Sequence, residues 1–252
     1  MPCRTSEDRE VSNKGRNSTC ERLIGSAFVS LDGVMQAPGG TTKDPTGGFK
    51  YGGWLPPHSD EASGKKVGDL FNRSFDLLLG RRTYDIFAAF WPYAEGNAKP
   101  MGEMFDRVRK YVVTRGDKPL TWQNSERVAS IEAVARVRNS EGPDLIIQGS
   151  STLYPQLLAA GLIDRLTLFT LPVVLGSGKR LFGGGTPSGA MRMVDHMVSS
   201  RGVIVASYEP AAQLIPEASR ARSQVKRKLR VERRWRTGLG EAQYVTAVIR
   251  HN

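Results

Sequence analysis

Apolar stretches of two kinds alternate along most of the chain. Short continuous runs, typical of buried strands, are followed by segments whose apolar residues have helical spacing. The runs lie at 75–80 (FDLLLG), 110–115 (KYVVTR) and 144–149 (DLIIQG), and the helical segments at 59–74, 83–91, 130–139 and 151–161. Strands that alternate with helices predict an α/β fold, in which a largely parallel sheet is covered on both faces.

Both ends of this alternating region carry further strand signals. An apolar run at 22–35 (RLIGSAFVSLDGVM) predicts a first strand that ends at the turn pair Asp32-Gly33. The run at 165–176 (RLTLFTLPVVLG) predicts a long strand. The segment 196–210 (HMVSSRGVIVASYEP) predicts a closing antiparallel hairpin that turns at Ser-Arg-Gly, residues 200–202.

A Gly/Pro-rich segment, residues 36–61, separates the first strand from the first helix. It is too long for an idle loop in a compact domain, so we expect a lid or substrate loop rather than a linker. The helix that follows is predicted to take Ser59 as its N-cap.

The chain divides into three parts by composition. Residues 1–20 are polar and predict a disordered leader, 21–210 form the predicted domain, and 211–252 are a basic and flexible tail. Both cysteines, Cys3 and Cys20, lie in the leader, which favours a reducing cytoplasm, and their spacing predicts neither a disulfide nor a metal site. No apolar run reaches the roughly 18–20 residues of a membrane span.

The formal net charge of +11 comes mainly from the tail. Residues 211–252 hold ten Lys/Arg against three Asp/Glu, a net charge of +7, whereas the domain 21–210 carries only +3. Nucleic acid is therefore an expected partner only through the tail, as an alternative function.

Three predicted strands end in glycine, hydroxyl or guanidinium groups. Gly149, Ser150, Ser151 and Thr152 follow DLIIQ, Gly80-Arg81-Arg82-Thr83 follow FDLLL, and Thr114-Arg115 close KYVVTR. In an α/β sheet, ligands gather at the carboxyl ends of strands, where the N–H groups of helix N-termini point.

Two of these strand ends also have an ordinary structural explanation. The hydroxyls beside Gly149 would suit a well-capped helix, which we expect to begin near Ser151, and the two arginines would suit a solvated turn. Their convergence in one sheet favours a single polyphosphate ligand spread over neighbouring loops. The segment 175–185 (LGSGKRLFGGG) lacks the glycine and hydroxyl spacing of a phosphate-binding P-loop.

The residues SLDGVMQAPGG (30–40), DLLLGRRTYDIFAAFW (76–91), KYVVTR (110–115) and the run 146–182 resemble the dihydrofolate reductase-like superfamily. The likeness spans roughly residues 22–209. It is closest to stand-alone relatives of the reductase domain of the bifunctional riboflavin-biosynthesis deaminase-reductase (the RibD C-terminal domain family). The resemblance implies a three-layer fold with a mostly parallel, twisted sheet, flanking helices, a C-terminal antiparallel hairpin and an NADPH site.

In that family, the turn after the second strand grips the cofactor phosphates, which points here to Gly80, Arg81, Arg82 and Thr83. The next strand end accepts the adenosine 2′-phosphate, which points to Thr114 and Arg115. The later turn lies beneath the pyrophosphate and nicotinamide, which points to Gly149, Ser150, Ser151 and Thr152. Ser150 departs from the family, because many members carry a second glycine there.

The resemblance implies hydride transfer from NADPH to a small planar heterocycle, either a 5-amino-6-(5-phosphoribosylamino)uracil-like pyrimidine or a pterin. Asp32 and Asp69 are the candidate catalytic carboxylates, although Asp32 also suits a plain turn and Asp69 an exposed helix position. Trp54 either stacks on the heterocycle or anchors its loop. A homodimer is expected from the relatives, and a non-catalytic NADP-binding module is the second alternative.

Overall fold

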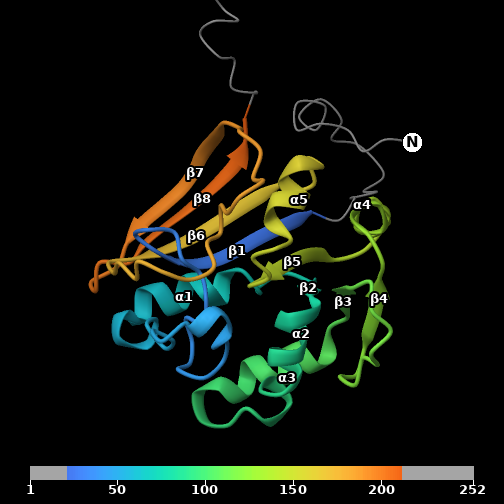
Figure 1. Ribbon diagram of the computed structural model, residues 1–252, viewed down its shortest axis with the longest axis horizontal. Coiled ribbons are helices and arrows are strands. Elements are labelled where there is room, and N and C mark those ends of the chain that lie inside the picture. The colour runs from blue at the N-terminus through green and yellow to red at the C-terminus, as the bar shows by residue number, and fades with distance from the viewer. Residues whose placement is uncertain (1–21, 212–252) are drawn as a thin grey trace, which may run out of the picture. The chain divides into compact units, whose positions relative to one another are not determined.

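The computed structural model describes residues 22–211 as one α/β unit (Figure 1). The predicted leader, its two cysteines and the predicted tail beyond Ala211 lie outside the described residues. The strands are β1 (Leu23–Ser30), β2 (Phe75–Gly80), β3 (Lys110–Val113), β4 (Ser125–Val128), β5 (Asp144–Gln148), β6 (Arg165–Leu171), β7 (Met191–Val198) and β8 (Ile204–Pro210). The α-helices are α1 (Glu61–Asp69), α2 (Arg81–Ala88), α3 (Lys99–Arg107), α4 (Ile131–Arg138) and α5 (Tyr154–Ala159).

Eight strands form one sheet in the order β4-β3-β2-β5-β1-β6-β8-β7. All pairs from β4 to β6 are parallel, and β8 runs antiparallel to both β6 and β7. The predicted mostly parallel sheet and its closing hairpin are therefore confirmed. The hairpin turns at residues 199–203, where Gly202 N–H donates to the Ser199 carbonyl.

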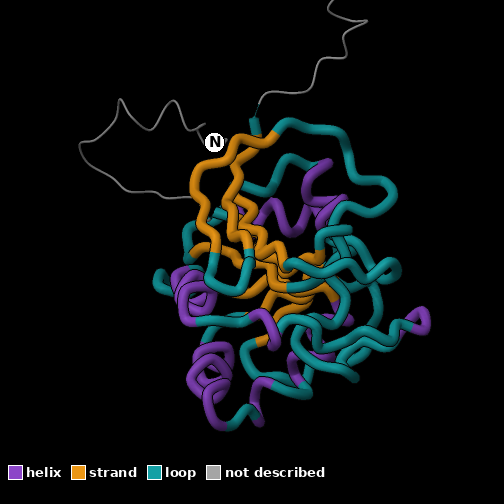
Figure 2. Tube along the Cα trace, turned by 90° about the vertical axis from the view of Figure 1, so that its left-hand side faces the viewer, coloured by secondary structure: helices purple, strands orange, loops and turns teal. Residues whose placement is uncertain are grey.

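Helices cover both faces of the sheet (Figures 1 and 2). All six residues of β2 are buried, and alternate side chains belong to different apolar clusters. Leu77 and Leu79 pack in the cluster with Tyr84 of α2 and Phe105 of α3, whereas Leu78 packs in the cluster with Val134 of α4 and Leu157 of α5. This two-sided burial explains why the strand is continuously apolar.

Several predicted boundaries are corrected by the structure. The N-cap of α1 is Asp60 rather than Ser59, because the Asp60 carboxylate accepts the Ser63 N–H and the Ser63 hydroxyl accepts the Asp60 N–H. Strand β6 ends at Leu171, since the next residue is Pro172 and lacks the N–H needed to continue the ladder. Helix α5 begins at Tyr154, so residues 151–153 form a turn before it rather than its first turn.

Two elements were not predicted at all. They are α3, which has a proline and a glycine near its start, and the short edge strand β4. Four 3₁₀ turns complete the fold, η2 (Thr46–Gly48), η3 (Pro56–His58), η4 (Trp91–Tyr93) and η5 (Gly96–Ala98). None of the helices within residues 22–211 is long and apolar enough to cross a membrane.

Candidate cofactor-binding site

Strands β3, β2 and β5 are neighbours in the sheet and run parallel, so their carboxyl ends meet at one edge. A cavity of about 720 Å³ opens at this edge. Eight of the ten residues predicted to bind the cofactor line it: Gly80, Arg81, Arg82, Thr83, Gly149, Ser150, Ser151 and Thr152. The structure therefore brings two of the three predicted strand ends into one cavity.

The turns after β2 and β5 are joined by side-chain hydrogen bonds. Ser150 N–H donates to the Thr83 hydroxyl (3.0 Å), and Gly80 N–H donates to the Ser150 hydroxyl (2.9 Å). Gly149 has a φ of 65°, and a Cβ there would lie 3.1 Å from the Thr83 methyl group. Glycine is needed at 149 because the backbone is left-handed and the two turns are in close contact.

The two arginines after β2 point to different partners. Arg81 extends away along α2, where it pairs with Asp85 (2.8 Å) and donates to the Lys118 carbonyl (2.7 Å). Arg82 pairs with Asp44 (2.8 Å) and keeps about half of its side chain exposed. Arg81 is thus paired within its own helix, whereas Arg82 is paired with the loop between β1 and α1.

The third strand end lines a second, smaller cavity of about 450 Å³. Thr114 and Arg115 lie there, together with Glu132 and Thr152. Because Thr152 lines both cavities, they are adjacent. All ten predicted cofactor-binding residues are therefore found on one pair of neighbouring cavities.

These residues suit a dinucleotide with an additional phosphate. The Arg115 guanidinium is exposed and forms no hydrogen bond or ion pair with any other residue of the described chain. Gly149 lines the larger cavity, and the Thr83 side chain occupies the space that a Cβ at 149 would need. A guanidinium without a salt-bridge partner beside a cavity is a group that binds phosphate.

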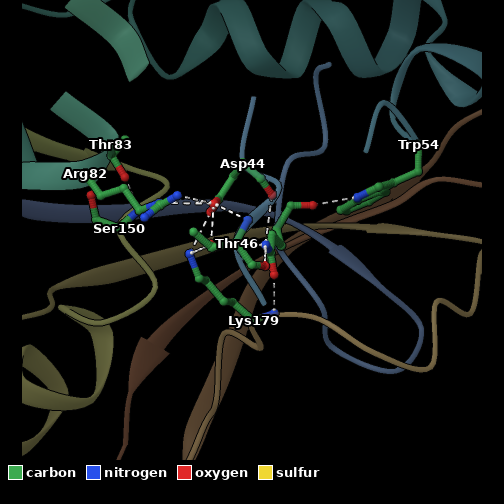
Figure 3. Close-up of polar contacts among 8 residues, drawn as sticks. Asp44, Thr46, Trp54, Arg82, Thr83, Ser150 and Lys179 are labelled. Atoms are coloured by element: carbon green, nitrogen blue, oxygen red, sulfur yellow. Dashed lines mark hydrogen bonds and ion pairs between the residues drawn. The ribbon is translucent and has the colours of Figure 1, made fainter. Parts of the chain in front are cut away.

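A carboxylate in the Gly/Pro-rich segment organises the opposite wall of the larger cavity. Asp44 accepts from Lys179 Nζ (2.7 Å), pairs with Arg82 and accepts from the Thr46 hydroxyl (2.5 Å) (Figure 3). Burial acts to raise the pKa of Asp44, but the hydrogen bonds from Lys179 and Thr46 and the charge of Arg82 outweigh it and lower that pKa. We call these four residues the Asp44 clamp; it ties the loop to α2 and to the segment after β6.

Gln36 extends this connection to the backbone. Its amide donates to the carbonyls of Asp44 and Thr46 (2.9 Å each) and accepts from Lys179 N–H (2.9 Å). The Trp54 indole donates to the Gln36 carbonyl (2.9 Å), and its ring is buried with Phe49 and Phe169. Trp54 does not line the cavity, so the structure places it as the anchor of its loop rather than as a stacking surface.

The two candidate catalytic carboxylates do not line the cavity either. Asp32 accepts from the Leu175 and Gly176 N–H groups (3.1 and 3.0 Å) and from the Ser30 hydroxyl (2.6 Å). Asp32 thus fastens the turn after β1 to the segment after β6, as its alternative interpretation as a turn residue implies. Asp69 is exposed on α1, where it pairs with Lys65 (3.4 Å).

Three of the four clamp residues, Asp44, Thr46 and Lys179, were missed from the sequence. Lys179 stands in the segment 175–185, which lacks P-loop spacing, yet its side chain reaches the cavity. Lys179 could have been found from the sequence, because it is a lysine between glycine-rich turns that follow a long apolar strand. In an α/β fold, residues after the carboxyl ends of strands often bind ligands. Nothing in the local sequence indicates that Asp44, 135 positions earlier, is its partner.

Comparisons with known proteins agree with this architecture. The model of the RibD C-terminal domain matches residues 22–205. The uncharacterised protein YyaP of Bacillus subtilis (strain 168) is 26% identical over 196 residues, which cover 74% of this chain and 94% of YyaP.

Two solved structures show the same fold at low sequence identity. A protein from Shewanella sp. PV-4, named for riboflavin biosynthesis, has a TM-score of 0.55 and 17% identity over 76% of this chain and 99% of its own. A pyrimidine reductase-like protein from Corynebacterium diphtheriae NCTC has a TM-score of 0.50 and 13% identity over 77% of this chain and 93% of its own. These likenesses confirm the predicted fold class.

Proposed function

The chain belongs to the RibD C-terminal domain family, and from this premise we propose that it is an NADPH-dependent reductase that transfers a hydride to a planar heterocycle. The substrate class is a 5-amino-6-(5-phosphoribosylamino)uracil-like pyrimidine or a pterin. The observation that carries the proposal is the meeting of three strand ends, with their arginines, hydroxyls and Gly149, on two adjacent cavities.

Each part of the cofactor has a matching group in this chain. The turn 80–83, which includes Arg82, suits the pyrophosphate. Thr114 and Arg115 suit the 2′-phosphate. The turn 149–152 lines the larger cavity, and its last residue, Thr152, also lines the smaller one. The nicotinamide supplies a hydride when it is bound, which leaves the protein to position the two rings and to exclude water.

The larger cavity is also suited to a planar ring. Its wall includes the aromatic side chains of Phe28, Phe87 and Trp91, together with Met35 and Met101. Aromatic and thioether groups bind flat heterocycles through dispersion and stacking. The Asp44 clamp closes the wall near Arg82 and keeps the loop 36–54 in contact with the domain.

The proposal is tested by following NADPH oxidation by the full chain. The substrates to compare are 5-amino-6-(5-phosphoribosylamino)uracil and dihydrofolate, each at several concentrations. Saturable oxidation with one of them supports a reductase and identifies the ring. If the protein binds NADPH but oxidises it with neither ring, the non-catalytic NADP-binding module becomes the better description.

A further inference from the structure

One cation in the wall of the larger cavity has no hydrogen-bonded or ionic partner among the described residues. Lys43, in the loop between β1 and α1, places its ammonium 3.6 Å from the centre of the Phe90 ring and 6.0 Å from that of Trp91. Its side chain is half-buried and lines the cavity. Within residues 22–211 the ammonium makes no hydrogen bond and no ion pair.

A half-buried ammonium without a carboxylate is unfavourable. Burial lowers the pKa of Lys43, which reflects that cost. The face of Phe90 offsets part of it, since the ring quadrupole attracts a cation placed over its face. An ammonium held in this way still has N–H groups that do not face the ring and can donate to a ligand.

The charges around the cavity do not neutralise Lys43. The charged residues of the wall are Lys43, Arg81, Arg82 and Lys179, against one carboxylate, Asp44. Arg81 is paired with Asp85, while Arg82 and Lys179 share Asp44. The cavity is therefore positive: Arg82 and Lys179 keep one excess positive charge over Asp44, and Lys43 adds a second that no carboxylate of the wall offsets.

Lys43 is also well separated from the phosphate-binding turn. Arg82 stands at the start of α2 and Phe90 just beyond its end, a separation of about 12 Å at the helical rise of 1.5 Å per residue. The side chains of Lys43 and Asp44 thus reach opposite ends of α2, because Asp44 contacts Arg82 and Lys43 contacts Phe90. An anion at Lys43 would not be the one bound at the turn 80–83.

We propose that the Lys43 ammonium binds an anionic group of the substrate, so that this reductase selects planar heterocycles that carry a phosphate or a carboxylate. The inference rests on the proposed function and assigns a specificity-determining residue to it. It excludes uncharged heterocycles as good substrates. The Phe90 ring holds the ammonium in place before the anion arrives.

The test compares three ligands that share one ring and one sugar: uridine, uridine 5′-phosphate and uridine 5′-carboxylate. Their dissociation constants are measured by calorimetry on the full chain, first with saturating NADP⁺ and then without it. We expect at least one anionic compound to bind about tenfold more tightly than uridine, the effect of one hydrogen bond to a charged group. The two anionic compounds distinguish phosphate from carboxylate.

Variants separate a specific contact from general electrostatics. Lys43→Met should abolish the preference for the anionic compounds, and Lys43→Arg should retain most of it. Lys50→Met is the matched control, because Lys50 lies in the same loop, is exposed and does not line the cavity; it should leave the preference unchanged.

Three results would overturn the assignment: weak or no binding of both anionic compounds, equal binding of all three, or an equal loss in Lys43→Met and Lys50→Met. The proposed function is judged separately by the NADP⁺ titration. If NADP⁺ fails to bind while uridine 5′-phosphate binds in a Lys43-dependent way, the anion site stands and the reductase proposal falls.

Discussion

At the scale of single residues, Ser150 shows why this chain departs from the glycine that many relatives carry. Its φ of 60° lies in the left-handed region, which costs a residue with a Cβ on the order of 1 kcal/mol. In exchange, its hydroxyl accepts the buried N–H of Gly80 at the end of β2. The serine therefore stabilises the contact between the two strand ends that form the cavity.

Replacing Ser150 should separate these two effects. Ser150→Ala leaves the Gly80 N–H without an acceptor and keeps the strained backbone, so we expect a loss of about 1–3 kcal/mol in the free energy of unfolding. Ser150→Gly loses the same bond but relieves the strain, so it should be more stable than the alanine variant by up to about 1 kcal/mol. Urea denaturation measures both. A glycine variant less stable than the alanine variant would contradict this account.

Asp32 is expected to act on stability rather than on chemistry. The Ser30 hydroxyl, followed by the N–H groups of Leu175 and Gly176, lowers the pKa of Asp32 to about 2, so the group is ionised at neutral pH and has no proton to donate. A lowered pKa contributes stability that is present above the ordinary value and is lost as the pH falls towards 2.

Asp32→Ala should therefore lower the melting temperature at pH 7 and leave the turnover of the folded protein unchanged. Asp69→Ala is the matched control, because Asp69 is exposed and bound only to neighbours on α1 and just beyond it, and it should change neither quantity. A large loss of turnover in a folded Asp32→Ala protein would return Asp32 to the list of catalytic residues.

Glu132 is a third residue with a distinct expected effect. It lines the smaller cavity with Arg115, and the Ser130 hydroxyl is the largest cause of its lowered pKa, so it is charged at neutral pH. A carboxylate there opposes a 2′-phosphate and favours a ribose hydroxyl. Glu132→Gln should raise the preference for NADPH over NADH about two- to fivefold, as exposed charge pairs allow. An unchanged ratio of the two dissociation constants would contradict this assignment.

At the scale of elements, the Asp44 clamp decides whether the loop 36–54 stays on the domain. Asp44→Ala would leave Lys179 and Arg82 side by side without their shared acceptor, and we expect a loss of about 1–3 kcal/mol. Amide hydrogen exchange should accelerate within the loop and not in β2 or β5. Lys50→Ala should change neither quantity, because Lys50 lies in the same loop but is exposed and its side chain forms no ion pair within residues 22–211.

The clamp has a definite pH dependence. Because the pKa of Asp44 is lowered, its stabilisation is complete above the ordinary carboxyl value of about 4 and is lost as the pH falls through the lowered pKa. The clamp is therefore intact at neutral pH. If amide exchange within the loop were no faster in the Asp44→Ala protein than in the unsubstituted protein, the clamp would not hold the loop.

The elements also show which signals are local and which are not. Strands β2 and β5 were predicted because continuous apolar runs identify strands buried on both faces. Strand β4 was missed because only Val128 of its four residues is buried. Helix α3 was missed because it contains Gly102, which has a low helix propensity. Glycine is needed there because a Cβ would collide with the Trp91 carbonyl, so tertiary packing rather than propensity determines this residue.

At the scale of the whole molecule, the same distinction separates the two walls of the site. One wall is made of turns that directly follow strands, and the rules for parallel sheets place such turns together, so residues 80–83 and 149–152 could be predicted from the sequence. The other wall joins Asp44 to Lys179 across 135 positions. No local pattern encodes that contact; it follows only once the sheet brings the segment after β6 against the loop after β1.

The central claim is that these two cavities form an NADPH site, and its most direct test is a titration of the full chain with NADPH and NADH, followed by nicotinamide fluorescence. We predict saturable binding that prefers NADPH. Arg115→Ala should weaken NADPH binding about tenfold or more, since a guanidinium–phosphate contact is lost, while Arg73→Ala, which removes an exposed arginine away from both cavities, should not. Absence of binding by either nucleotide, or equal effects of the two variants, would contradict the account.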